Sequence, residues 1–127
     1  MHIFLIDDDD KVLRSIGRFL RAVGHHVQTA CNGLEALRCL EEETPDVVIS
    51  DIRMPGMDGV ALLQEVGERF PDLPVILMTG YQSAETAVAA LRERAFDYLK
   101  KPIQPEVLLA CLERAQGGTG LTENCRA

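Results

Sequence analysis

Short apolar runs, each with a polar residue just after it, are the feature that most constrains the fold of this chain. The runs are Ile3–Ile6, Val47–Ser50, Val75–Met78 and Asp97–Leu99, and the polar residues are Asp7 and Asp8, Asp51, Thr79 and Lys101. If the runs are parallel strands, their carboxyl ends share one edge of a sheet, where ligands of open α/β sheets bind. The polar residues would then meet in one small pocket, suited to a hard divalent cation together with a phosphoryl group.

Segments with helical periodicity separate these runs along the chain. Strict alternation of strand and helix is typical of an α/β domain whose parallel sheet carries helices on both faces. We predict five strands and five helices, with His26–Ala30 as a strand at one edge. Right-handed crossovers then favour the strand order 2-1-3-4-5, which is the flavodoxin-like, doubly wound arrangement.

Each predicted helix has an inner face of apolar or small residues repeating at intervals of three and four. These faces are Val12, Ile16, Phe19, Leu20 and Val23; Leu34, Leu37 and Leu40; Leu62, Leu63 and Val66; Ala84, Ala87, Val88, Leu91 and Ala95; and Leu108, Cys111, Leu112 and Ala115. We expect Gly24 to end the first helix. Asn32 and Glu35 indicate a variant capping box at the second helix, and Pro105 suits the first position of the fifth.

Length and charge narrow the classes of protein to which the chain can belong. The 127 residues suit one domain, predicted at residues 1–115, with a Gly-rich linker or tail at 116–127. The net charge of −7 argues against direct binding of nucleic acid or of an anionic membrane by this segment. No apolar stretch approaches the ~20 residues of a membrane span, and we expect no signal peptide. The four cysteines are scattered, which favours free thiols and a cytoplasmic location.

The residues at the strand ends can support phosphoryl transfer. Asp7, Asp8 and Asp51 would repel one another in one pocket, and Mg²⁺, which prefers oxygen ligands, would relieve that repulsion. Asp51 can serve as the nucleophile, because carboxylates form acyl phosphates in known enzymes. Lys101 would neutralise charge on the phosphoryl group, and the Thr79 hydroxyl would hydrogen-bond one of its oxygens.

Longer motifs around these residues resemble a known family. The motifs are Phe4–Asp9, Pro45–Gly59, Met78–Gly80 and Ala95–Pro102. Together they are similar to the receiver domain of two-component response regulators, and the resemblance covers about residues 2–115. The stretch around Asp51 is most similar to receivers of the nitrogen-regulation type, which precede an ATPase and a DNA-binding domain.

The resemblance implies a role for each acidic residue of the pocket. Asp51 matches the phosphoacceptor that takes a phosphoryl group from a sensor histidine kinase. Asp8 matches the direct metal ligand, and Asp7 matches the neighbour that holds a metal-bound water. Arg53 would contribute its backbone carbonyl to the Mg²⁺ site. Counting back from the end of the first helix favours Asp7 and Asp8 over Asp8 and Asp9 as the metal pair. Asp9 or Asp10 is then left to cap that helix.

The resemblance also implies a switching mechanism. Lys101 matches the phosphate-contacting lysine, and the Lys101–Pro102 bond is expected to be cis. Thr79 matches the switch hydroxyl and Tyr98 the aromatic switch position. Phosphorylation would draw Thr79 inward, Tyr98 would follow, and the face of the fourth helix, fifth strand and fifth helix would bind a partner differently. The chain would thus be a signalling switch that controls a downstream output domain in transcription, and a homodimer through the fourth-helix face is compatible with the family.

Three other functions stay open at this point. An aspartyl phosphohydrolase usually carries an acid two residues after its nucleophile, where this chain has Arg53. A flavin or nucleotide binder would need a Gly-rich loop after the first strand, where this chain has aspartates. A pseudo-receiver would bind partners without being phosphorylated, but every expected pocket residue is present.

Overall fold

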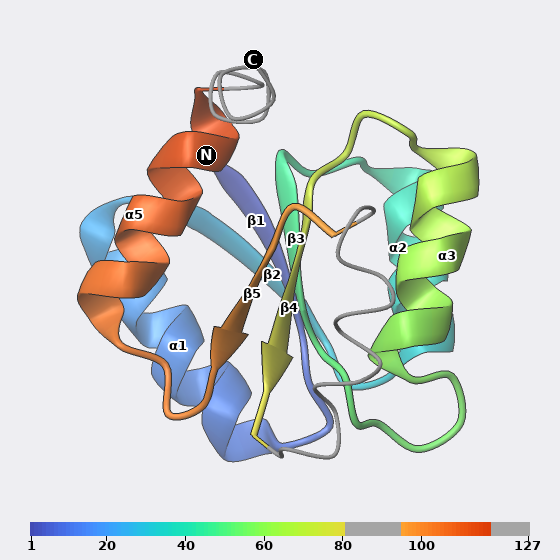
Figure 1. The fold of residues 1–127 in the computed structure, drawn as a ribbon, viewed down its shortest axis with the longest axis horizontal. Coiled ribbons are helices and arrows are strands. Elements are labelled where there is room, and N and C mark those ends of the chain that lie inside the picture. The colour runs from blue at the N-terminus through green and yellow to red at the C-terminus, as the bar shows by residue number, and fades with distance from the viewer. Residues whose placement is uncertain (81–94, 118–127) are drawn as a thin grey trace.

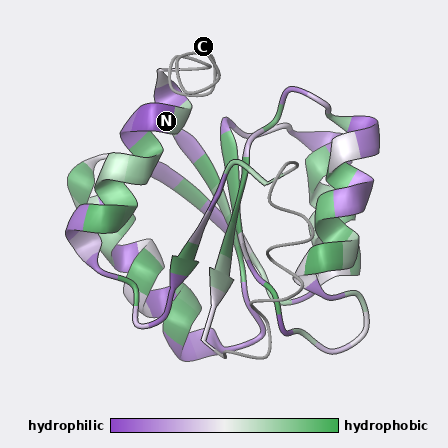
Figure 2. Cartoon of the chain, in the orientation of Figure 1, coloured by the Kyte–Doolittle hydropathy of each residue, from purple (hydrophilic) through white to green (hydrophobic). Residues whose placement is uncertain are grey.

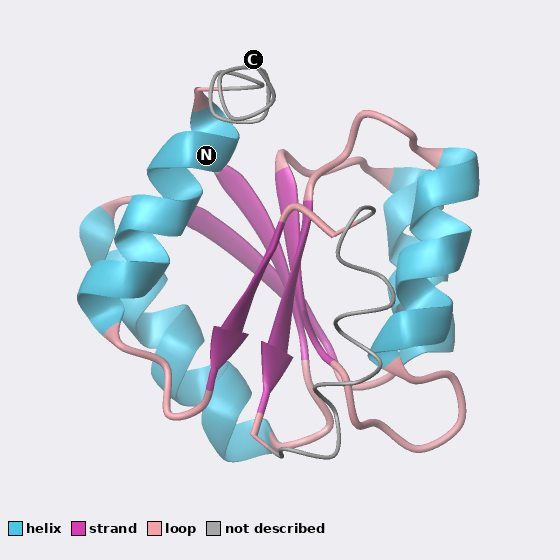
Figure 3. Cartoon of the chain, viewed as in Figure 1, coloured by secondary structure: helices cyan, strands magenta, loops and turns pink. Residues whose placement is uncertain are grey.

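A computed structural model describes residues 1–80 and 95–117 and shows a five-stranded parallel sheet between two layers of helices (Figure 1). The strands are β1 His2–Ile6, β2 His26–Ala30, β3 Val47–Asp51, β4 Val75–Thr79 and β5 Asp97–Lys100. The helices are α1 Asp10–Val23, α2 Gly33–Glu42, α3 Gly59–Arg69 and α5 Pro105–Gln116. Helices α1 and α5 cover one face of the sheet, and α2 and α3 cover the other (Figure 3).

The strand order is β2-β1-β3-β4-β5, and all neighbouring pairs are parallel, which confirms the predicted topology. Asp51 and Thr79 are the last residues of β3 and β4, one position further inside the sheet than the sequence suggested. Both side chains therefore start from backbone that is held by the hydrogen-bonded ladder. This arrangement restricts their movement more than a loop position would.

Two buried clusters of apolar side chains lie on opposite faces of the sheet. One joins Phe4, Ile6, Val48 and Leu77 to α2 and α3, and the other joins Ile3, Leu5, Ile49 and Ile76 to α1 and α5. The strands β3 and β4 are buried along their whole length, as expected for central strands covered on both faces. Hydrophobic colour accordingly dominates β4, whereas the edge strand β5 and the helices carry hydrophilic colour as well (Figure 2).

The expected helix ends are mostly confirmed. Gly24 ends α1 in the left-handed conformation with φ 112°, which glycine adopts without steric cost. Asn32 caps α2 by accepting a hydrogen bond from the Glu35 amide. The Glu35 carboxylate, however, accepts from the amide of Cys31 at 3.2 Å, one residue before the cap. Pro105 begins α5 as predicted.

The prediction that Leu34 and Val23 lie on the inner faces of their helices is wrong. Leu34 is 66% exposed and Val23 is 47% exposed, although both fit the helical spacing. Each lies in a terminal turn of its helix, Val23 at the end of α1 and Leu34 at the start of α2. In α1 the buried positions are Leu20, as predicted, together with Leu13 and Gly17.

Some sequence predictions fall outside the described residues. The predicted fourth helix lies there except for Ala95, and so do residues 118–127 of the predicted tail. The boundary at residue 115 therefore stays a prediction, with α5 ending at Gln116. Within the described ranges, every helix is too short or too polar to cross a membrane.

Candidate functional site

Three aspartates converge at the carboxyl edge of the sheet. Asp7 follows β1, Asp8 follows Asp7, and Asp51 ends the neighbouring strand β3, in a register that pairs Ile6 with Ser50. One carboxylate oxygen of each lies within 4.8 Å of the others. Asp7 is fully buried, Asp51 is buried and Asp8 is exposed, so the cluster opens to solvent on the Asp8 side.

Asp9 is turned away from this cluster. Its side chain caps α1, with Oδ1 accepting a hydrogen bond from the Lys11 amide at 2.9 Å. Its own amide donates to Asp7 Oδ1 at 2.9 Å. The structure thus groups Asp7 and Asp8 with Asp51, and gives Asp9 the capping role that the sequence assigned to it or to Asp10.

Lys101 brings the single positive side chain seen among these carboxylates in the described part of the chain. Its Nζ atom lies 3.0 Å from Asp7 Oδ2 and 3.4 Å from Asp51 Oδ2. Its backbone amide donates to the Thr79 carbonyl at 2.7 Å, which fixes the residue at the end of β4. The Lys101–Pro102 peptide bond is cis, as the family resemblance implied.

The electrostatics of the site leave Asp51 only partly compensated. Burial raises the pKa of Asp51, and the charge of Asp7 raises it further, while Lys101 and the Arg53 amide offset part of this. Burial of Lys101 opposes its charge, but its hydrogen bond to Asp7 and the nearby carboxylates outweigh burial and raise its pKa. The ammonium is therefore firmly charged, and the site holds three acids against one cation.

The other predicted site residues surround this cluster. Thr79 ends β4, is buried, and follows Met78, which pairs with Asp51 in the sheet. Arg53 lies exposed in the loop after β3, and its backbone amide hydrogen-bonds the Asp51 carboxylate. Tyr98 lies on β5 opposite Leu77 and packs, partly buried, against the core under α2 and α3.

The loop between β3 and α3 closes the site on one side. Gly56 turns the loop with φ 75°, and Asp58 caps α3 by accepting from the Ala61 amide at 2.9 Å. The Gly59 amide then donates to the Ile52 carbonyl at 2.8 Å, which brings the start of α3 back to the end of β3. The sequence places Gly59 at the end of the Pro45–Gly59 motif, but no role for it was predicted. A glycine directly after a helix cap, where a stronger helix former is expected, was the available signal.

These residues fit a hard divalent cation. The donors are carboxylate oxygens at the ends of two adjacent strands, and the pKa of Asp51 is raised by burial and then by the charge of Asp7. Oxygen donors of this kind are those that Mg²⁺ prefers, and neither histidine nor cysteine joins the cluster within the described residues.

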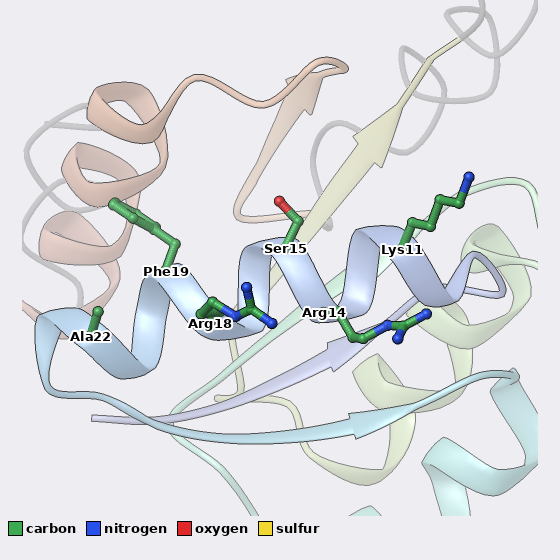
Figure 4. A pocket seen from close by; sticks show the side chains of 6 residues that line it. All are labelled: Lys11, Arg14, Ser15, Arg18, Phe19 and Ala22. Atoms are coloured by element: carbon green, nitrogen blue, oxygen red, sulfur yellow. The ribbon is translucent and has the colours of Figure 1, made fainter.

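A shallow groove on α1 lies apart from the acidic cluster. Its lining residues are Lys11, Arg14, Ser15, Arg18, Phe19 and Ala22 (Figure 4). Arg14 forms an ion pair with Asp10 at 2.7 Å on the solvent-exposed side of the helix. The groove has no carboxylate among its lining residues and does not share the chemistry of the cluster.

Comparison with known proteins identifies related chains. A family model described as the response regulator receiver domain matches residues 3–113. The chain is 45% identical over 113 residues to the DNA-binding transcriptional regulator NtrC of Escherichia coli K12, covering 89% of this chain and 24% of that protein. It is 41% identical over 122 residues to the transcriptional regulatory protein ZraR of Klebsiella oxytoca, covering 96% and 28%. The chain thus spans about a quarter of the length of these relatives.

Solved structures show the same fold. A response regulator receiver domain protein from Clostridium thermocellum superposes with a TM-score of 0.87 at 34% identity, covering 95% of this chain and 98% of that one. NtrX from Brucella abortus, in complex with ATP, superposes with a TM-score of 0.85 at 32% identity, covering 98% of this chain and 29% of that one. The same fold therefore occurs in a chain of similar length and as part of a longer chain.

Proposed function

Because the chain belongs to the family of response regulator receiver domains, we propose that it accepts a phosphoryl group on Asp51 from a sensor histidine kinase. The observation that carries this proposal is the placement of Asp51 between two further aspartates and a lysine. Its carboxylate shares a cluster with Asp7 and Asp8, and Lys101 Nζ lies 3.4 Å from its Oδ2 atom. A nucleophile, a cation site and a fixed positive charge are the parts that phosphoryl transfer needs.

In the proposed reaction, Asp51, Lys101 and Thr79 each have a separate role. A carboxylate oxygen of Asp51 forms a bond to phosphorus while the bond from phosphorus to the donor nitrogen of histidine breaks, and the electron pair leaves with that nitrogen. Lys101 stabilises negative charge on the phosphoryl oxygens, and the Thr79 hydroxyl donates a hydrogen bond to one of them. The product is an aspartyl phosphate on this chain, which water later hydrolyses.

The metal site that we propose uses the same cluster. Both oxygens of Asp7 already accept hydrogen bonds, one from the Asp9 amide and one from Lys101, whereas Asp8 is exposed. This supports Asp8 and Asp51 as direct ligands, Asp7 as holder of a bound water, and the Arg53 carbonyl as a further ligand. When bound, Mg²⁺ would neutralise charge on the phosphoryl oxygens in the transition state.

Phosphorylation would act on the rest of the domain through β4 and β5. Thr79 and Tyr98 lie on these neighbouring strands, and Tyr98 packs partly buried against the core. Movement of Thr79 toward a phosphoryl group would open space for the Tyr98 ring, which changes the surface that β5 and α5 present. This is a shift between two packings of the same chain.

The relatives suggest what the switch controls. NtrC is named a DNA-binding transcriptional regulator, and NtrX was solved with ATP, so we propose a downstream ATPase or DNA-binding output domain and a role in transcription. Direct nucleic-acid binding by this segment is disfavoured by its net charge of −7. The three described cysteines are free, which supports a cytoplasmic location, and a homodimer through the fourth-helix face remains part of the proposal.

Intact mass measured after incubation with Mg²⁺ and a small acyl-phosphate donor tests the proposal. We expect one added phosphoryl group on the parent chain and none on Asp51→Asn, which keeps the shape of the residue but removes the nucleophilic carboxylate. Omission of Mg²⁺ should also prevent the addition.

Other outcomes would point to other functions. No adduct from the donor or from a histidine kinase would indicate a pseudo-receiver that only binds partners. An adduct that forms equally on Asp51→Asn would reject Asp51 as the acceptor. Steady release of phosphate from a range of phosphate monoesters would indicate a phosphohydrolase, although Arg53 stands where such enzymes carry an acid.

A further inference from the structure

The first residue of α3 lies against the backbone of the proposed phosphoacceptor. A Cβ atom at Gly59 would overlap the Asp51 carbonyl oxygen, and would lie 2.8 Å from Ile52 Cα and 3.0 Å from the Asp51 carbonyl carbon. All three atoms belong to the main chain, so no side-chain rotation can make room. Glycine, which has no Cβ atom, is therefore the residue type that allows α3 to start at position 59.

Neither the end of β3 nor helix α3 can move away from this contact easily. The Ile52 amide donates to the Met78 carbonyl at 3.0 Å, which holds the end of β3 to β4. On the other side, Leu62, Leu63 and Val66 bury α3 in the core, so the helix cannot slide without opening it. A side chain at Gly59 would therefore have to be accommodated in the loop of residues 53–58, which joins β3 to α3.

That loop carries groups that form the proposed site. The Arg53 amide hydrogen-bonds the Asp51 carboxylate, and its carbonyl is a proposed metal ligand. The same loop contacts the start of α2, because a Cβ at Gly33 would lie 2.9 Å from Met57 Cγ and 3.0 Å from the Met57 carbonyl oxygen. Gly33 on α2 and Gly59 on α3 thus set how close the loop comes to these two helices.

We propose that Gly59, supported by Gly33, is a positioning residue for the phosphoacceptor site. By allowing main-chain contact with Asp51 and Ile52, Gly59 sets the position of the loop that orients the Asp51 carboxylate and the Arg53 carbonyl. This inference rests on the proposed function, since it names the residue that places the proposed metal ligands. In this role Gly59 acts through the loop and does not itself touch the phosphoryl donor.

The test compares Gly59→Ala with Gly67→Ala. Both add one methyl group to α3, but a Cβ at Gly67 meets nothing within 4 Å. The Kd of Mg²⁺ is measured by titration calorimetry on folded protein, and the phosphorylation rate is measured at saturating Mg²⁺ with an acyl-phosphate donor. We expect Gly59→Ala to weaken Mg²⁺ binding and to slow phosphorylation by about tenfold or more, since misplacement by about 1 Å can reduce rates a hundredfold. Gly67→Ala should match the parent in both.

The metal affinity separates positioning from a purely structural role. A structural role alone would lower the Tm of Gly59→Ala and leave the Mg²⁺ Kd of the folded protein unchanged, and that result would overturn the inference. Equal weakening in Gly67→Ala would overturn it as well. If the parent binds Mg²⁺ but is never phosphorylated, the proposed function fails, while the comparison of Mg²⁺ affinities still decides the role of Gly59.

A second variant keeps the test decisive if Gly59→Ala does not fold. Gly33→Ala presses on the same loop at Met57, where a Cβ atom would lie 2.9 Å from Cγ and 3.0 Å from the carbonyl oxygen, so its overlap is smaller than at Gly59 and the variant should stay folded. We expect its Mg²⁺ binding to weaken by about twofold to fivefold, a smaller effect than main-chain overlap would produce. Affinity equal to that of the parent would then reject the proposal that glycine contacts position the site.

Discussion

Lys101 Nζ lies 3.0 Å from Asp7 Oδ2, although the two residues are 94 positions apart in the sequence. Asp7 is fully buried, and Lys101 is the cation that compensates it. The pair joins the end of β1 to the loop after β5 across the middle of the sheet. It therefore links the acidic cluster to the strand that carries Tyr98.

Replacing Lys101 by alanine should destabilise the domain in the absence of a metal. The buried Asp7 carboxylate would lose its ion pair, and loss of the opposite charge would raise the pKa of Asp51 further. We expect a loss of about 2 kcal/mol in the free energy of unfolding, below the range for fully buried pairs because the lysine is partly exposed. Urea unfolding at neutral pH measures it. Lys100→Ala, on the exposed neighbour, should change stability by less than about 0.5 kcal/mol, and an equal loss there would contradict the explanation.

Asp51→Asn should stabilise the metal-free domain. The folded-state pKa of Asp51 is raised by burial and by Asp7, so the charged carboxylate opposes folding. Its favourable contribution is present below the ordinary pKa of 3.8 and is lost as the pH rises through the folded-state pKa. The variant should therefore match the parent at the acid end and exceed it by about 1 kcal/mol near pH 7, a typical size for one substitution. Thermal unfolding measured from pH 4 to 7 checks this, and a gap that does not grow with pH would refute it.

Mg²⁺ should raise the stability of the parent through the Asp7, Asp8 and Asp51 cluster. A ligand that binds only the folded state stabilises it by about 2.7 kcal/mol at a hundred times its Kd. Asp8→Ala should remove most of this response, because Asp8 belongs to the cluster and is a proposed direct ligand of the metal. Melting curves with and without Mg²⁺ provide the measurement.

Asp9→Ala is the matched control for the metal prediction. Asp9 caps α1, so its loss should lower stability by about 1 kcal/mol while leaving the response to Mg²⁺ intact. If Asp9→Ala loses the response to Mg²⁺ as Asp8→Ala does, the metal pair is Asp8 and Asp9 and the proposed site is wrong.

Cys111 should be unreactive in the native domain. Burial, together with the nearby Asp97 carboxylate, raises the pKa of its thiol to about 12, and the Arg114 side chain that pairs with Asp97 offsets only part of this. At pH 8 almost no thiolate forms, whereas Cys31 is exposed. Alkylation followed by peptide mass analysis should label Cys31 first and Cys111 only after unfolding. Rapid labelling of Cys111 in native protein would show that α5 does not pack as described.

Much of the fold could be predicted because strand and helix signals are local. The apolar runs, Gly24 and Asn32 depend on neighbours within a few positions, and the predicted topology is confirmed. The errors at Val23 and Leu34 have one cause. Helical periodicity shows which side of a helix faces inward, but not whether a terminal turn is covered by other elements, and both residues lie in terminal turns.

The sequence by itself determined the order of elements, the edge of the sheet where acids gather, and the residue types available for phosphoryl chemistry. Only the tertiary structure decided which aspartates share the cluster, which of them caps α1, and that Lys101 reaches Asp7. It also showed that Gly59 touches the main chain of Asp51. The reason is physical: local propensities act over a few residues, whereas these contacts join segments brought together only when both faces of the sheet are packed.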